Sequence, residues 1–302
     1  MPIVIAHRGA SGYRPEHTLA AYELGARQGA DYIEPDLVST ADGHLVARHE
    51  NEIAGTTDVA DHPELAARRT TTTIDGAERT GWFTDDLTLA EVRTLRARER
   101  IPELRPANAE HDGRHGIPTL QEVIDLAARL TRELGRPIGI YPETKHPSHH
   151  RDLGLPLEPR LVEVLRRNEL DGPGAPVFVQ SFEPWSLQAL REQLGVPLVQ
   201  LLAAGAGERA TPDGLRAIAA YADAVGPAKR LVDRPFVEAA HAAGLLVHPY
   251  TFRRENAFLP PELRSGDDPT APGDLEAELR RFYGLGVDGV FCDHPDVAAM
   301  AR

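Results

Sequence analysis

The chain has 302 residues with 46 acidic and 33 basic side chains, which gives a formal net charge of -13. A negative field of this size argues against nucleic acid or an anionic membrane surface as the main partner, and no stretch approaches the roughly 18 apolar residues of a membrane span. The single cysteine, Cys292, excludes a disulfide within the chain. The length fits one (β/α)₈ barrel of roughly 250 residues plus an insertion, without a second core.

Nine short apolar runs predict β-strands, and most of them alternate with helical segments, which is typical of parallel α/β architecture. In chain order the predicted strands are Ile3–His7, Asp31–Val38, His44–His49, Ile138–Glu143, Val177–Phe182, Leu198–Leu202, Ala222–Gly226, Leu245–Thr251 and Gly289–Asp293. An eight-stranded barrel leaves one of these runs over. Asp42-Gly43 predicts a tight hairpin between the second and third runs, so the irregular strand is one of these two.

Apolar residues at spacings of three and four predict helices between the strands. The predicted helices are Thr18–Gln28, Thr119–Leu134, Glu158–Asn168, Pro184–Gln193, Pro235–Ala243 and Leu275–Tyr283. Thr119 followed by Glu122 predicts a capping box at the start of the second of these helices.

The alternation stops after His49, and residues 51–117 are predicted to be an insertion within a single barrel domain that spans residues 1–302. The insertion contains the threonine run Thr70–Thr73 and one predicted helix, Leu89–Arg96. Because it follows a strand, we expect it to form a lid or rim subdomain on the catalytic face of the barrel; a decorative surface insertion is the alternative. A second loop, Arg253–Gly273, is rich in Pro, Gly and Asp and is expected to form another part of the rim.

Acidic side chains end two of the predicted strands. Glu34 and Asp36 stand two residues apart on one strand and therefore share a face. Two like charges so close are costly unless a cation or a proton lies between them. Glu143 ends a later strand and can add a third oxygen from across the barrel. An all-carboxylate set suits Ca²⁺ or Mg²⁺ better than zinc, and the alternative is that these acids pair with arginine or lysine at the rim.

His7 and His49 both end apolar runs, so a barrel brings them to the same mouth. Imidazoles can exchange acid and base roles in a two-step displacement, or each can be satisfied by one structural hydrogen bond. Arg8 offers a planar fork for phosphate oxygens and Lys145 a point charge, unless either forms an ion pair at the rim. Glu16 precedes the first helix and either holds a ligand hydroxyl or a catalytic histidine, or packs at the helix start.

Other polar groups support weaker predictions. His146, His149 and His150 follow in a proline-containing segment, which is expected to be a solvated loop rather than a second metal site because the spacing matches no usual ligand pattern. Cys292 is interpreted as a buried small hydrophobe. Three residues at the ends of later strands either line the pocket or pack beneath it: Gln180, Phe182 and Tyr250.

Several segments, in this order, resemble the glycerophosphodiester phosphodiesterase family: HRGASGYRPEHT, GADYIEPDLVSTADGHLVARHE, IPTLQEV, IGIYPETK, VQSF, LLVHPYTF and DGVFCDHPD. The chain is most similar to the branch related to the bacterial periplasmic enzyme, in which PEHT, YPE-x-K and VHPYT occur together. The resemblance runs from end to end and implies a TIM barrel of the phospholipase-C-like phosphodiesterase type. Family members commonly carry tryptophan where Tyr250 stands and threonine where Cys292 stands. These two differences from the family pattern concern the wall of the pocket.

The resemblance implies metal-dependent hydrolysis of glycerophosphodiesters to sn-glycerol 3-phosphate and an alcohol, through a cyclic phosphate. It also implies one divalent cation, Ca²⁺ or Mg²⁺, and leaves open which histidine is the acid. A leaving group the size of choline, ethanolamine or glycerol is expected. The implied roles are acid/base catalysis by His7 and His49, metal binding by Glu34, Asp36 and Glu143, and phosphate contacts by Arg8 and Lys145.

Two alternative functions are also consistent with parts of the sequence. A lysophospholipase D or phosphatidylinositol-cleaving relative needs an apolar entrance, of which a chain with 6% aromatic residues gives little sign. A non-catalytic phosphodiester-binding barrel is disfavoured because both histidines and all three carboxylates are present. Met1-Pro2 leads directly into the first predicted strand, so the sequence as it stands predicts a cytoplasmic protein; a removed leader would mean a periplasmic or secreted one.

Overall fold

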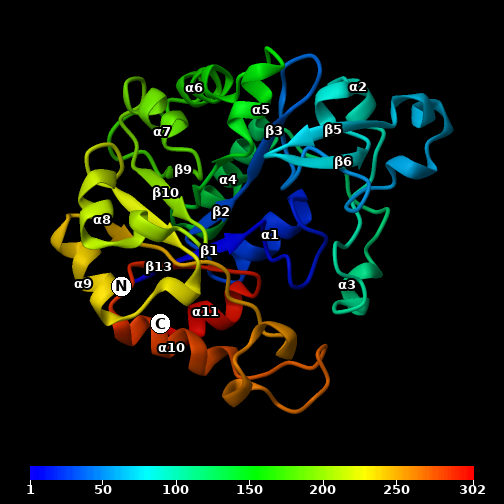
Figure 1. The fold of residues 1–302 in the computed structure, drawn as a ribbon. Coiled ribbons are helices and arrows are strands. Elements are labelled where there is room, and N and C mark those ends of the chain that lie inside the picture. The colour runs from blue at the N-terminus through cyan, green and yellow to red at the C-terminus, as the bar shows by residue number, and fades with distance from the viewer.

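Short apolar runs form the eight positions of a closed parallel barrel, and helices surround it (Figure 1). The computed structural model describes all residues, 1–302. Neighbouring barrel strands pair in parallel, and a bridge between Phe252 and Cys292 closes the ring. The predicted TIM barrel is therefore confirmed. Its strands are β1 (Ile3–His7), β2 (Tyr32–Glu34) with β3 (Asp36–Ser39), β7 (Gly139–Ile140) with β8 (Glu143–Thr144), β9 (Val179–Ser181), β10 (Leu198–Leu202), β11 (Ala224–Pro227), β12 (Leu246–Val247) and β13 (Gly289–Cys292).

Prolines divide two of the barrel positions. Pro35 separates β2 from β3, and Pro142 lies between β7 and β8, so the single strands predicted for Asp31–Val38 and Ile138–Glu143 are wrong in their bounds. Proline has no N–H to donate to a ladder, which locally interrupts the pairing. The chain stays in register across the break, because the Glu143 amide donates to the Pro35 carbonyl at 3.0 Å.

The third predicted run is the irregular one. It forms β4 (Leu45–Ala47), which pairs antiparallel with β3 through Leu37 and Ala47, as the Asp42-Gly43 hairpin signal indicates. The strand therefore lies outside the barrel ring and leads the chain into the insertion.

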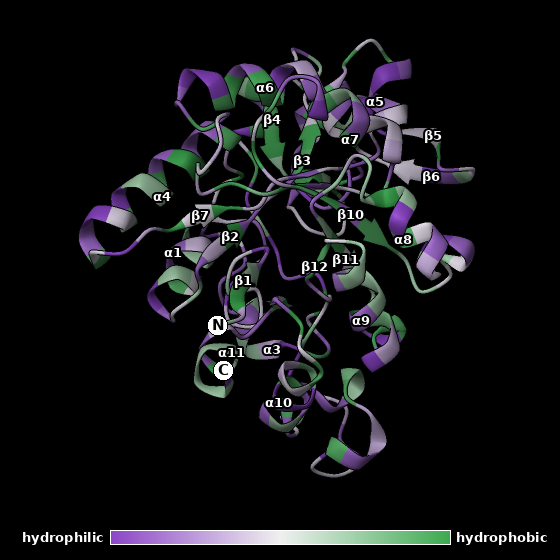
Figure 2. Cartoon of the chain, turned by 90° about the vertical axis from the view of Figure 1, so that its left-hand side faces the viewer, coloured by the Kyte–Doolittle hydropathy of each residue, from purple (hydrophilic) through white to green (hydrophobic).

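Helices form the outer layer, and most begin within one or two residues of the predicted positions. Their apolar stripes face the strands, and the polar faces point outward (Figure 2). The capping box at Thr119 and Glu122 is present. None of the helices combines the length and the apolar character that a membrane-crossing segment needs. The bounds are α1 (Leu19–Arg27), α4 (Leu120–Leu134), α5 (Pro147–Asp152), α6 (Leu157–Arg167), α7 (Pro184–Arg191), α8 (Pro212–Ile218), α9 (Arg234–Ala242), α10 (Leu275–Leu285) and α11 (Pro295–Ala301).

The loop predicted around His146, His149 and His150 is wrong, because Pro147 starts helix α5 there. A proline is well placed in the first turn of a helix, where its missing N–H has no partner to lose. The helix buries the ring of His150 completely and pairs His149 with Asp85 at 2.7 Å. Periodicity could not show this, since a helix of six residues has no repeat to detect.

The insertion has its own small apolar cluster and packs against β3 and β4. It contains the antiparallel hairpin of β5 (Thr70–Ile74) and β6 (Ala77–Gly81), followed by the short helices α2 (Leu89–Val92) and α3 (Pro106–Ala109). The threonine run thus forms a strand, and the helix predicted to reach Arg96 ends one turn earlier. The cluster that anchors the insertion consists of Val38, Val46, Ile53, Val59, Leu65, Leu87, Val92, Leu95 and Ile117.

Aromatic rings fill the barrel interior beneath its mouth. Tyr141 stacks on Phe178 with ring centroids 5.0 Å apart and meets Phe291 edge-on at 5.0 Å, while Tyr32 packs edge-on against both Tyr141 and Phe178. These four rings are called the aromatic plug below. The Tyr141 hydroxyl also lies 2.9 Å from Nδ1 of the buried His248.

His248 is expected to make stability depend on pH. Burial lowers its pKa from 6.5 to about 4, so the ring is neutral in the folded protein and gains a proton on unfolding. Because the pKa of His248 is lower in the folded than in the unfolded protein, the neutral ring stabilises the folded state above pH 6.5. This stabilisation is lost as the pH falls through about 4. Between about pH 7 and pH 4, the free energy of unfolding should fall by about 3 kcal/mol more in wild type than in His248→Gln. Urea unfolding across this range tests it, and parallel curves for the two proteins would contradict it.

Candidate active site

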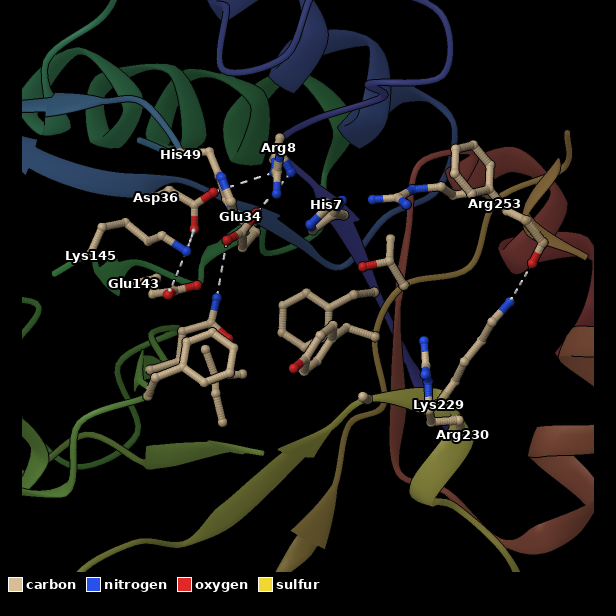
Figure 3. Close-up of a pocket in the computed structure, with 18 of the residues that line it drawn as sticks. His7, Arg8, Glu34, Asp36, His49, Glu143, Lys145, Lys229, Arg230 and Arg253 are labelled. Atoms are coloured by element: carbon tan, nitrogen blue, oxygen red, sulfur yellow. Dashed lines mark hydrogen bonds and ion pairs between the residues drawn. The ribbon is translucent and has the colours of Figure 1, made fainter. Parts of the chain in front are cut away.

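A cavity of about 490 Å³ opens at the carboxyl ends of the barrel strands, the face where TIM barrels hold their chemistry (Figure 3). Polar side chains from β1, β2, β3 and β8 converge on it, because each lies at or next to the end of its strand. Phe291 of the aromatic plug forms part of its floor. The lining includes every residue that the sequence predicted for catalysis, metal binding or phosphate contact: His7, Arg8, Glu34, Asp36, His49, Glu143 and Lys145.

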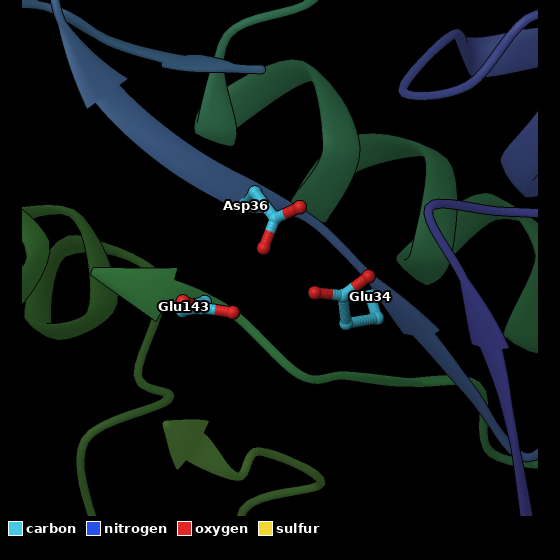
Figure 4. A group of neighbouring side chains, drawn as sticks. All are labelled: Glu34, Asp36 and Glu143. Carbon is cyan, nitrogen blue, oxygen red and sulfur yellow. The ribbon is translucent and has the colours of Figure 1, made fainter. Parts of the chain in front are cut away.

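Three buried carboxylates form one group (Figure 4). Glu34 and Asp36 flank Pro35, and Asp36 is the register partner of Glu143 across the β3–β8 pair. One oxygen from each of the three lies within 4.8 Å of the others. Burial and then the neighbouring Asp36 hold the pKa of Glu34 well above its usual range, and the same causes, partly opposed by Lys145, raise the pKa of Glu143 to about 8. The group is short of positive charge, and a divalent cation with oxygen ligands fits it.

Arg8 and Lys145 supply part of the missing charge. The Arg8 amide donates to Glu34 at 2.8 Å, and its guanidinium lies 3.4 Å from Asp36. Lys145 Nζ lies 2.8 Å from Glu143 and 3.9 Å from Asp36. The backbone at Arg8 is left-handed, with φ 59°, and the next residue, Gly9, has φ 87°. A Cβ at Gly9 would lie 2.5 Å from the Ala21 carbonyl carbon, so this turn requires glycine.

His17 and Gln180 orient two of the carboxylates. His17 is fully buried, with Nε2 2.9 Å from Asp36 and Nδ1 2.7 Å from the Tyr22 hydroxyl. Gln180 donates to Glu34 at 3.0 Å. Sequence reasoning missed the role of His17, although it lies in the quoted PEHT segment.

Each candidate acid/base histidine is held by a carboxylate through the same ring nitrogen. His7 Nδ1 lies 2.6 Å from Asp293, and His49 Nδ1 lies 2.5 Å from Glu50. A neutral ring that donates through Nδ1 leaves Nε2 free to accept a proton, and neither Nε2 has a protein hydrogen-bond partner. Burial and the nearby Arg8 lower the pKa of both rings, that of His49 to about 3. Both rings are therefore neutral in this structure, each with a free Nε2.

The insertion provides an arginine to the carboxylate behind each histidine. Arg100 bridges Glu50 and Glu16 with contacts of 2.6 Å to each. Arg105 joins Asp293 at 2.7 Å to Glu255 at 2.5 Å. Sequence reasoning did not find these arginines or Asp293, because the pairs are separated by 50 to 188 residues and no motif connects them.

Loss of Arg100 or Arg105 is expected to lower kcat about 10-fold or more while KM changes little, because the arginine orients a histidine and does not touch substrate. Arg100→Met and Arg105→Met test this in steady-state kinetics, with Arg98→Met as the control, since Arg98 is an exposed partner of Asp61. Arg100→Lys should recover part of kcat because it keeps a charge beside Glu50. A rise in KM alone in either methionine variant would contradict a positioning role.

The remaining predicted residues lie at or beside the cavity. Glu16 accepts from Arg8 at 2.9 Å as well as from Arg100, so it joins the two cations instead of projecting freely. Phe182 and Tyr250 line the cavity, and their rings meet edge-on at 6.1 Å. Among the histidine, cysteine and acidic side chains, Glu34, Asp36 and Glu143 are the one group of three whose ligand atoms lie close enough together to hold an ion.

Comparison with known proteins gives the family and the fold of the chain. The sequence profile of the glycerophosphoryl diester phosphodiesterase family matches residues 7–297. The chain is 34% identical to a glycerophosphodiester phosphodiesterase of Arabidopsis thaliana, covering 97% of this chain and 83% of that relative. It is 32% identical to one of Bacillus subtilis, covering 98% and 84%. A phosphodiesterase of Oleispira antarctica, solved in complex with the product sn-glycerol-3-phosphate, shares the fold with a TM-score of 0.67 at 22% identity, covering 100% of this chain and 96% of that chain.

Proposed function

The chain belongs to the glycerophosphoryl diester phosphodiesterase family, and on that premise we propose how its site hydrolyses glycerophosphodiesters to sn-glycerol 3-phosphate and an alcohol. One observation carries the proposal. His7 and His49 are each oriented through Nδ1 by a carboxylate, and both line the cavity that holds the three acids, Arg8 and Lys145. This pairs two proton-transfer groups with a site for an anionic phosphoryl group.

In the first step, one histidine removes the proton of the glycerol hydroxyl next to the phosphate. That oxygen attacks phosphorus, the bond from phosphorus to the alcohol oxygen breaks, and the other histidine gives its proton to the leaving alcohol. The product is a cyclic glycerol phosphate. A bound phosphodiester anion opposes the effect of Arg8 and raises the histidine pKa values, so that one ring can carry a proton when substrate is in place.

In the second step the two histidines exchange roles. The ring that lost its proton takes one from water, the water oxygen attacks phosphorus, and the ring that gained a proton returns it to the glycerol oxygen as the cyclic bond breaks. Both rings end in their starting states, so the cycle closes with the uptake of one water molecule.

The carboxylates and cations of the site counter the charge on phosphorus. Glu34, Asp36 and Glu143 would hold one divalent ion, Ca²⁺ or Mg²⁺, which supplies positive charge beside the phosphoryl oxygens when bound. Arg8 and Lys145 face the same space and add fixed positive charge.

The surface around the cavity favours a small, water-soluble alcohol over an acyl chain. The large apolar side chains that are exposed lie scattered, and of these only Phe182 is at the cavity. A lysophospholipid or phosphatidylinositol substrate needs a continuous apolar entrance. The hairpin of the insertion forms one wall of a second cavity of about 530 Å³ beside His49. The residues that line this cavity are largely polar or charged. On this basis the insertion limits the leaving group to small polar alcohols.

Product analysis tests the proposal directly. With glycerophosphoethanolamine and added Ca²⁺ or Mg²⁺, the protein should release sn-glycerol 3-phosphate and ethanolamine, and a chelator should abolish the release. Phosphorus NMR should detect a cyclic phosphate early in the reaction. Release of phosphoethanolamine instead would place cleavage on the wrong side of phosphorus, and no turnover with either metal would overturn the function.

A further inference from the structure

The cavity carries its own positive charge on the side opposite the metal ligands. Glu34, Asp36 and Glu143 belong to β2, β3 and β8, whereas Lys229 and Arg230 follow β11, and Arg253 follows β12. In the order of the barrel, β11 and β12 lie halfway around the ring from β2, β3 and β8. Figure 3 shows the two groups on either side of the open space. The residues Lys229, Arg230 and Arg253 are called the cationic wall below.

No acidic side chain lines this part of the cavity, because the acids in its lining are the three metal-site carboxylates. Lys229 is bonded to Glu278 at 2.7 Å, and Arg253 to Asp293 at 2.9 Å through Nε alone. The terminal nitrogens of Arg253 have no protein acceptor, and the exposed Arg230 has no ion pair or hydrogen bond at all. These free donors face the cavity in a chain of net charge -13, and they are available to an anion.

Two of the aromatic rings that line the cavity already face a protein cation. Arg253 already lies over the ring of Phe258 at 4.6 Å, and Lys145 over the ring of Phe182 at 5.7 Å. A trimethylammonium or ammonium group that sought these faces would meet a protein cation there. These two rings are therefore less available to a cationic alcohol than rings without a cation would be.

Resting on the proposed function, we infer that the cationic wall binds an anionic group on the alcohol half of the substrate, so that the protein prefers glycerophosphodiesters whose alcohol carries a carboxylate or a second phosphate. The glycerol half has only hydroxyl groups, and the reacting phosphate belongs at the metal ligands. An anion at the cationic wall must then come from the alcohol. Arg230 contributes most to this preference, because its guanidinium has no protein partner.

Matched substrate pairs test the inference. Glycerophosphoserine differs from glycerophosphoethanolamine by one carboxylate, and bis(glycerophospho)glycerol differs from glycerophosphoglycerol by a second glycerophosphate unit, which adds one phosphodiester charge. We expect kcat/KM to be about 10-fold higher for the more anionic member of at least one pair, and the pair that responds identifies the anion. High salt should reduce the preference, because partly exposed charges are screened.

Arg230→Gln should lower the preference about five-fold, whereas Arg209→Gln should leave it unchanged. Arg209 is a matched control, since it is exposed, has no ion pair and lies outside the cavity. Equal rates within both pairs, or a preference that survives Arg230→Gln intact, would overturn the inference while hydrolysis of glycerophosphoethanolamine upheld the proposed function. Absence of hydrolysis of all four substrates would overturn both.

Discussion

Replacement of His7 or His49 by alanine is expected to lower kcat by roughly 10²–10⁴-fold, the usual contribution of one positioned proton-transfer group. Neither ring contacts a metal-site carboxylate in the hydrogen-bond network, since each is bonded to Asp293 or Glu50. The fold and the metal affinity should therefore stay close to wild type. Circular dichroism and metal titration of both variants separate a catalytic defect from a structural one.

The two alanine variants should differ in how they depend on the leaving group. A p-nitrophenyl ester of glycerol 3-phosphate needs little protonation as its bond breaks, so it should restore much of the rate in the variant that has lost the acid and little in the other. This comparison assigns acid and base between His7 and His49. Near-normal turnover of glycerophosphoethanolamine by either variant, with metal bound, would remove that histidine from the mechanism.

Loss of one metal-site carboxylate is the second change with a large expected effect. Asp36→Asn or Glu143→Gln keeps the shape of the side chain but removes one negative charge from a three-carboxylate set. We expect the dissociation constant for Ca²⁺ or Mg²⁺ to rise by about 10²-fold or more, and activity to fall in parallel. Calorimetric titration of each metal measures the first and product release the second.

A matched control separates this effect from a general loss of acidity. Glu192→Gln removes an exposed carboxylate that has no ion pair in the structure, and it should leave metal binding unchanged. Unaltered metal affinity in both Asp36→Asn and Glu143→Gln would exclude the carboxylate group as the cation site.

The barrel and the core of its site were predictable because their signals are local. Apolar runs separated by amphipathic helices predict a parallel barrel, and the strand-end rule then brings Glu34, Asp36 and Glu143 to one mouth although more than a hundred residues separate the last from the first two. The hairpin signal at Asp42-Gly43 also narrowed the irregular strand to two runs, and the structure shows that it is the second of them, β4.

The supporting groups could not be predicted in the same way. Asp293, Arg100 and Arg105 act through partners that are distant in sequence, and an arginine in the insertion looks like any surface arginine until its partner is known. His17 lies in a quoted segment, but the sequence does not show that its ring turns inward to Asp36. Helix α5 is too short for periodicity, and only its packing against the insertion reveals it.

The aromatic plug gives the barrel a single opening. Phe291 forms the floor of the cavity, and Tyr141, Phe178 and Tyr32 continue the seal below it. Substrate, alcohol, water and product of the proposed reaction must therefore all pass through the opening at the strand ends. The alcohol released in the first step and the water used in the second then share one route, which a barrel open at both ends would not require.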